Sequence, residues 1–241
     1  CGVCITRVTL WCDVLQLWCY RPWLLGDAVC KLSQFVSECC TFASILHMTA
    51  LGAERYLAVC WPLRARLLVT RRRVRALILA LWAVALLSAG PVLLLVGAEQ
   101  LEEGGASECR CTQHALSSGL LTAMLWLSNL YFLVPLCLLT VLYGLMGRRL
   151  RLRRDHAHRH TLRMMVAIVL AFVLCWLPFH AGRTLLSVSA VPGGDLYYVS
   201  QYLNLVSLVL FYLSAAINPL LYNTMSGRYR AAVRSLLRPG A

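Results

Sequence analysis

The chain has 241 residues, of which 60% are hydrophobic and 14% charged, and its formal net charge is +13. Its mean hydropathy is +0.69. A soluble domain of this length cannot bury so much apolar surface, because the buried fraction grows only slowly with chain size. The composition therefore predicts a membrane protein. It also argues against nucleic-acid binding, because the arginines lie in short runs between apolar segments and not on one folded soluble face.

The beginning of the chain does not read as a complete membrane helix. Residues 1–12 match no element that we can place, and the apolar stretch at 8–19 is too short to cross a bilayer. We expect this stretch to be the outer end of another helix. No initiator methionine and no signal-peptide pattern opens the chain, which predicts a fragment or a wrongly assigned start.

Five later stretches are long enough to cross the hydrocarbon layer, which takes roughly 20 helical residues for ~30 Å. In lipid, a single spanning segment can satisfy all its backbone hydrogen bonds internally only as a helix. We therefore expect five membrane helices, at about 28–60, 76–98, 116–146, 164–187 and 197–224.

The charges between these stretches predict their orientation. Arginines cluster at 64–75, 148–159 and 228–238, whereas the intervening loops carry Glu99 to Glu108 and Asp195. Basic loops face the cytoplasm, so we expect a multi-pass protein with a cytoplasmic C-terminus. The tail at 226–237 is expected to form an amphipathic helix along the inner membrane surface, with a frayed basic tail as the alternative.

The chain has twelve cysteines, and most of those inside spans are expected to act as small apolar residues. Cys30 begins the first complete span, and Cys109 and Cys111 lie in the acidic outer loop. An oxidising exterior favours one bridge from Cys30 to that loop, which would stabilise the fold by about 4 kcal/mol through chain entropy. We favour Cys109, with Cys111 as the alternative. The spacing favours no metal site.

Several motifs place polar groups and prolines inside these apolar stretches. Glu54, Arg55 and Tyr56 stand at the inner end of the first complete span, where the simplest account is an arginine that reaches the headgroups. CWLP at 175–178 and NPLLY at 218–222 put prolines inside helices, where they loosen the backbone. Pro135 lies in the third span, with Tyr143 two turns further inward. Each motif alone is weak, but their order and spacing together are specific.

With these motifs the chain resembles the rhodopsin-like (class A) G protein-coupled receptors, through Cys30, ERY at 54–56, Trp82, Pro135 with Tyr143, CWLP and NPLLY. Longer stretches, such as YRPWLLGDAVCKLSQFVSE and SQYLNLVSLVLFYLSAAINPLLYN, look like the ghrelin and motilin receptor subgroup. The resemblance implies an all-α membrane protein with the seven-transmembrane receptor fold, here lacking helix 1 and most of helix 2. It predicts a single transmembrane receptor domain over 13–241.

The resemblance implies an activation switch at the inner face. Arg55 would hold the inactive state and then meet the G protein, with Glu54 as its first carboxylate partner and Tyr56 beside it. The remaining switch residues would sense the ligand, bend helices or stabilise the open inner face: Tyr143, Trp176, Pro178, Asn218, Pro219 and Tyr222.

The ligand site is expected among the outer halves of the helices. An unpaired charge at membrane depth is costly, so we expect Glu38 and Arg183 to pair across the cavity. The alternative is a purely structural ion pair. Further expected ligand-binding residues are Asp13, Gln34, Phe179 and Phe211.

The resemblance therefore predicts a plasma-membrane receptor, not an enzyme, for a peptide hormone of the ghrelin or motilin type, which can be acylated. It would activate a heterotrimeric G protein of the Gq type and calcium signalling, with membrane lipids as its other partners and no cofactor. The alternatives are a neurotensin- or neuromedin-type peptide receptor and a truncated chain that does not signal. A polytopic transporter is a further alternative, but the sequence shows no internal repeat.

Overall fold

A computed structural model describes residues 23–100, 107–152 and 156–188, together with 195–196, 198–200, 202–207 and 209–210. The chain divides into two compact units at residue 170, within one helix, and each unit is described by itself. Several predictions lie outside the described residues: the helix end at 8–19, the tail helix at 226–237, Asp13, Phe211, Asn218, Pro219 and Tyr222. The predicted single domain over 13–241 stays a prediction.

Helix α2 (Gly26–Cys60) confirms the first predicted span. It ends at Cys60 because Trp61 precedes Pro62, and a residue that precedes proline disfavours the helical conformation. A short helix, α3 (Pro62–Leu68), starts directly afterwards, with proline in the first helical position, where its missing N–H costs nothing.

The second predicted span, at 76–98, is wrong at its end. Helix α4 (Arg71–Ala89) begins at a cap in which Thr70 Oγ1 accepts from the Arg73 amide. It stops before Gly90 and Pro91 and is followed by the one-turn helix α5 (Val92–Leu95). From Val96 the chain is extended, because strand β1 (Val96–Gln100) pairs antiparallel with strand β2 (Ser107–Cys111).

The third and fourth predicted spans exist as helices with different ends. The short helix α6 (Gln113–Ser117) is separated from α7 (Leu120–Leu152) by Gly119, whose φ of +74° favours glycine. Helix α7 contains Pro135, and helix α8 (His156–Val188) contains Pro178. Among the described residues, three helical stretches are long and apolar enough to cross a membrane, at 26–60, 71–95 and 120–151; the apolar part of α8, at 169–185, is shorter.

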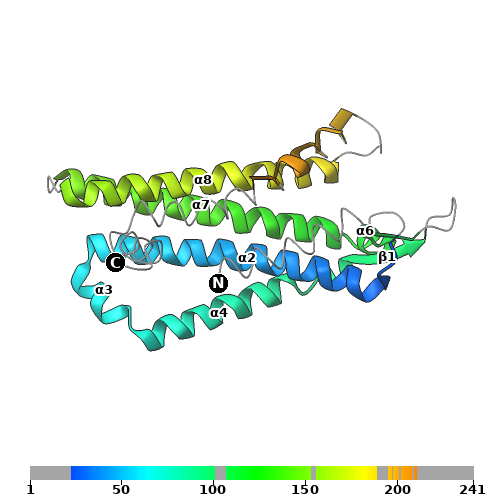
Figure 1. Cartoon of the computed structure of the whole chain (residues 1–241), viewed down its shortest axis with the longest axis horizontal. Helices are drawn as coiled ribbons and strands as arrows, with labels where there is room; N and C mark the ends of the chain where they lie inside the picture. Colours follow the sequence, from blue (N-terminus) through cyan, green and yellow to red (C-terminus); the bar gives the residue numbers. More distant parts are fainter. Residues whose placement is uncertain are drawn as a thin grey trace, which may run out of the picture. The chain divides into compact units, whose positions relative to one another are not determined.

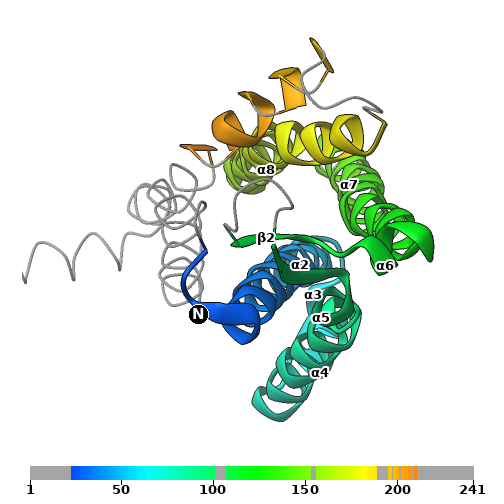
Figure 2. The same ribbon diagram turned by 90° about the vertical axis from the view of Figure 1, so that its right-hand side faces the viewer.

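In the first unit, α2 lies between α4 and α7 (Figures 1 and 2). Phe42 of α2 stacks on Tyr131 of α7 with ring centroids 4.3 Å apart. The contact with α4 is made by fully buried alanines, Ala43 on α2 against Ala85 and Ala89 on α4. Small residues let membrane helices approach closely, which replaces the hydrophobic driving force that lipid cannot supply.

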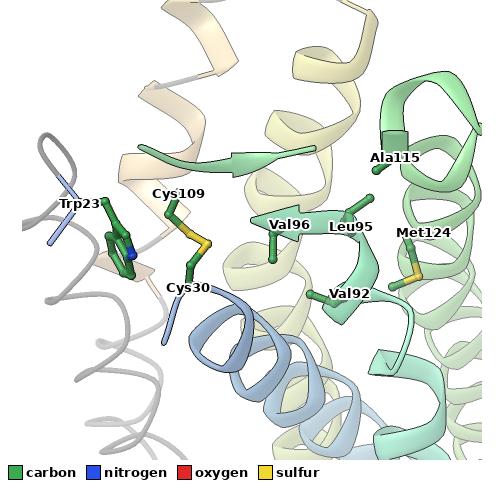
Figure 3. Packing of buried hydrophobic residues seen from close by; sticks show 8 residues of the cluster. All are labelled: Trp23, Cys30, Val92, Leu95, Val96, Cys109, Ala115 and Met124. Carbon is green, nitrogen blue, oxygen red and sulfur yellow. A yellow bond between two sulfur atoms is a disulfide. The ribbon is translucent and has the colours of Figure 1, made fainter. Parts of the chain in front are cut away.

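The end of the first unit that contains the hairpin is closed by a disulfide. Cys30 of α2 bonds Cys109 of β2, with Cα atoms 5.7 Å apart, and this confirms Cys109 as the predicted partner (Figure 3). Cys111 forms no disulfide. The bridge belongs to a buried apolar cluster that also contains Trp23, Val92, Leu95, Val96, Ala115 and Met124. Val92, Leu95 and Val96 are therefore buried in this cluster, whereas Leu94 between them is exposed.

Candidate functional site

The Glu54-Arg55-Tyr56 motif lies in the last two turns of α2. Arg55 is exposed, whereas Glu54 and Tyr56 are half-buried. Within the part of the chain that the structure describes, neither Glu54 nor Arg55 takes part in an ion pair. One turn before Arg55 on the same helix, Gly52 lies against Tyr143, a buried residue of α7. Two of the predicted switch residues, Arg55 and Tyr143, therefore lie at the same end of the first unit, on neighbouring helices.

Gly52 makes this arrangement possible, and the sequence analysis missed it. A β-carbon at Gly52 would overlap Leu139 Cδ2 and lie 2.7 Å from the Tyr143 hydroxyl. A side chain at position 52 would therefore push α7 or the tyrosine ring away. Glycine within an apolar helix is a recognised signal for such a close approach, so this residue was open to prediction.

Trp61 forms a second contact at the same end of α2 that the sequence analysis did not foresee. The Arg149 guanidinium lies 4.4 Å from the indole centroid and that of Arg64 lies 5.0 Å from it. Arg149 comes from the end of α7 and Arg64 from α3. The indole therefore joins the segment that follows the Glu54-Arg55-Tyr56 motif to the end of α7 through cation–π contacts.

Towards the disulfide end of α2, Glu38 is buried with 8% of its surface exposed, and Gln34 is half-buried. The two side chains are four residues apart and so lie on the same face of the helix. A carboxylate is costly to bury away from water. Its position inside the bundle is therefore consistent with the predicted polar site, although the pairing of Glu38 with Arg183 joins the two units and stays a prediction.

In the second unit, α8 carries an aromatic cluster around Trp176. The indole is buried and packs against Phe172 at 5.9 Å, Phe179 at 6.0 Å and His180 at 6.2 Å between ring centroids. Arg183 lies over the Phe179 ring at 5.1 Å. Three predicted site residues, Trp176, Phe179 and Arg183, therefore lie side by side along two turns of α8 that contain Pro178.

The sequence matches one protein family, "7 transmembrane receptor (rhodopsin family)", over residues 1–222. The rat growth hormone secretagogue receptor type 1 is 54% identical over 240 residues, which cover 93% of this chain and 66% of that receptor. The human motilin receptor is 44% identical, with 93% of this chain and 67% of the receptor covered. The mouse neuromedin-U receptor 2 is 33% identical, with 94% and 62% covered.

The chain belongs to the rhodopsin family of seven-transmembrane receptors, the class A G protein-coupled receptors. Within this family it falls in the subgroup of ghrelin (growth hormone secretagogue) and motilin receptors. It spans about two thirds of the length of the curated relatives that it matches. The predicted family and fold class are thereby confirmed.

Proposed function

We propose that this chain is the membrane part of a peptide-hormone receptor of the ghrelin and motilin type that activates a Gq-type G protein and calcium release. The observation that carries the proposal is the close approach of Gly52 to Tyr143, one turn before Arg55, at one end of the first unit, whose opposite end is held by the Cys30–Cys109 disulfide. A ligand that binds at the disulfide end with different affinity for two arrangements of the helices can shift the equilibrium between them.

The direction of the helices supports a ligand site at the disulfide end and a G protein site at the opposite end. Helices α2 and α7 run parallel, because Phe42 contacts Tyr131 and, further along both helices, Gly52 contacts Tyr143. Both helices therefore end on the arginine-rich side, for which the positive-inside rule predicts the cytoplasm. The disulfide is at the opposite end, where an oxidising exterior preserves it. On this orientation the C-terminus is cytoplasmic.

In the proposed mechanism, the Arg55 guanidinium changes its partners when the inner ends of the helices separate. In the resting state, the adjacent carboxylate of Glu54 is available to it. In the active state, its five N–H donors are free to reach backbone carbonyls or a tyrosine of the G protein, and Tyr143 stabilises the open arrangement. The two states differ in what Arg55 binds, which is the differential interaction that a remote ligand must bias.

The proposed ligand is a peptide with a cationic end and an apolar group. The buried carboxylate of Glu38 suits a cationic peptide terminus. The rings of Trp176 and Phe179 suit an acyl or aromatic group. Arg183, whose charge lies over Phe179, is expected to separate the two regions by pairing with Glu38.

Two alternatives are tested by the same experiment. The first alternative is a neuromedin-type ligand. The identity with the neuromedin-U receptor 2 is 33%, whereas the identity with the growth hormone secretagogue receptor is 54%, so a ghrelin-type ligand is better supported. The second alternative is a chain that does not signal and only associates with a relative. Calcium should be measured in cells that express the longest natural chain containing this sequence, with acylated ghrelin, motilin and neuromedin U applied separately.

The proposal predicts calcium release with ghrelin or motilin at concentrations at least tenfold below any response to neuromedin U. A response to neuromedin U alone would replace the proposed ligand class. Surface-expressed chain with no response to any of the three peptides would support the non-signalling alternative.

A further inference from the structure

An apolar groove runs between α7 and the first half of α8, entirely within the first unit. Its volume is about 440 Å³. The α8 side of the groove is formed by four aliphatic side chains, and the α7 side includes two glycines and two arginines. None of the ten residues that line it is acidic. The groove is therefore largely apolar, and the charged residues that line it are all positive.

The two glycines open the groove along α7. A β-carbon at Gly144 would meet nothing within 4 Å, and one at Gly147 would meet only Leu162 Cδ2 at an ordinary 3.4 Å. Neither glycine is thus required for a close contact between helices, unlike Gly52. Glycine weakens a helix relative to alanine, so the missing side chains have a cost and leave room for something outside the chain.

The arginines lie at one end of the groove. Arg148 and Arg151 are three residues apart on α7, so they share one face of the helix, and both are exposed. They stand where the apolar span at 120–151 ends. By the positive-inside rule this end is cytoplasmic, and the cytoplasmic leaflet is the one that carries anionic lipids.

We propose that this groove binds an anionic phospholipid of the cytoplasmic leaflet. An acyl chain lies along Gly144 and Gly147 against Val166 and Val169, and the phosphate accepts hydrogen bonds from Arg148 and Arg151. A guanidinium matches a phosphate through two parallel N–H donors. The groove favours a lipid over a soluble anion, because its apolar lining contacts the acyl chain. The site is separate from the proposed peptide site and does not depend on the proposed signalling activity.

The test is native mass spectrometry of the purified full chain with added phosphatidylserine or phosphatidylcholine. The proposal predicts phosphatidylserine adducts that fall about tenfold or more in Arg148→Gln/Arg151→Gln, since each arginine near a membrane surface contributes measurably to anionic-lipid binding. It predicts a similar loss in Gly144→Leu/Gly147→Leu, which fills the groove and keeps the charge. The matched control, Arg71→Gln/Arg72→Gln, removes two exposed arginines at the start of α4 and should keep the adducts.

An equal loss of phosphatidylserine adducts in the control would show that the lipid responds to the total number of arginines and not to Arg148 and Arg151. Full binding by the variant with the filled groove would show that the lipid does not occupy the groove. Either result overturns the proposal. An excess of inorganic phosphate should not displace the lipid; if it does, the site recognises a free anion. Because a variant can fail to fold, photoreactive phosphatidylserine should also be crosslinked to the unmodified chain. Adducts are expected within 140–151 and 162–170, and adducts only elsewhere would contradict the proposal.

Discussion

Gly52 of α2 lies against the phenol of Tyr143 of α7, so closely that a β-carbon on the glycine would come within 2.7 Å of the hydroxyl oxygen. Arg55 follows three residues later, one turn along the same helix. The contact places Tyr143 near the level of Arg55 and brings the C-terminal ends of the parallel helices α2 and α7 close together. A residue without a side chain thus sets the distance across which the proposed switch works.

Replacement of Gly52 by alanine should destabilise the resting bundle. The new methyl group would collide with Leu139 and Tyr143, and overpacking of this kind costs about 1–3 kcal/mol. Thermal unfolding of the purified chain measures the effect. Gly144→Ala is the matched control, because its methyl group meets nothing within 4 Å, and it should be neutral or slightly stabilising. Equal stability of the two variants would show that α2 and α7 do not touch at Gly52.

Cys109→Ser should be far more damaging than Cys111→Ser. The bridge to Cys30 closes 79 residues of chain, which corresponds to about 4 kcal/mol of unfolded-state entropy. Cys111 lies on the same strand but forms no disulfide. Surface expression and thermal stability under oxidising conditions should fall strongly for the first variant and little for the second. The reverse order would assign the bridge to Cys111.

The Trp61 contact should contribute a small and specific stabilisation. A double-mutant cycle with Trp61→Ala and Arg149→Ala measures the coupling free energy directly. We expect about 0.5–1 kcal/mol, the usual size of an exposed cation–π contact. Trp126 provides the control, because its side chain is 67% exposed on the same helix as Arg149. A coupling free energy between Trp126 and Arg149 as large as that between Trp61 and Arg149 would show that the Trp61 contact is not specific.

Charge reversal at Glu38 and Arg183 tests the proposed ligand site. Each single change, Glu38→Arg or Arg183→Glu, should lower peptide potency at least tenfold, because a charge is left buried without its opposite. The double reversal should recover part of the loss if the two groups pair. Reversal of the exposed Asp27–Lys31 pair at the start of α2 serves as the control. Full potency in both single variants would exclude the pairing.

The sequence predicted the positions of the apolar helices better than their ends. The first span was expected at 28–60 from its apolar length and is a helix from Gly26 to Cys60; Pro62 is the physical reason for its end. Helix α7 was expected to stop near 146 but continues to Leu152. Hydropathy reports where lipid surrounds the chain, whereas a helix ends where its backbone hydrogen bonds end, and arginines favour helix well enough to continue one into water.

The hairpin and the Trp61 contacts could not be predicted from the sequence, for different reasons. The predicted span ran past Leu95 into strand β1, because the apolar run that ends at Val96 does not show by its periodicity where helix gives way to strand. Trp61 gave no signal of the two arginines that cover it, since those contacts depend on how α3 and α7 meet. The Cys30–Cys109 pair was predictable because Cys30 begins the first complete span and Cys109 lies in the acidic loop expected outside the membrane, where an oxidising environment favours a disulfide.

The central claim is that Arg55 transmits a peptide signal from the far end of the bundle to a G protein. Its most direct test is peptide-stimulated nucleotide exchange on a purified Gq-type protein, by the longest natural chain with and without Arg55→Gln. We predict that the variant still binds peptide, whereas stimulated exchange falls at least roughly tenfold, within the usual range of coupling between sites. Unchanged resting and stimulated exchange in Arg55→Gln would contradict the account.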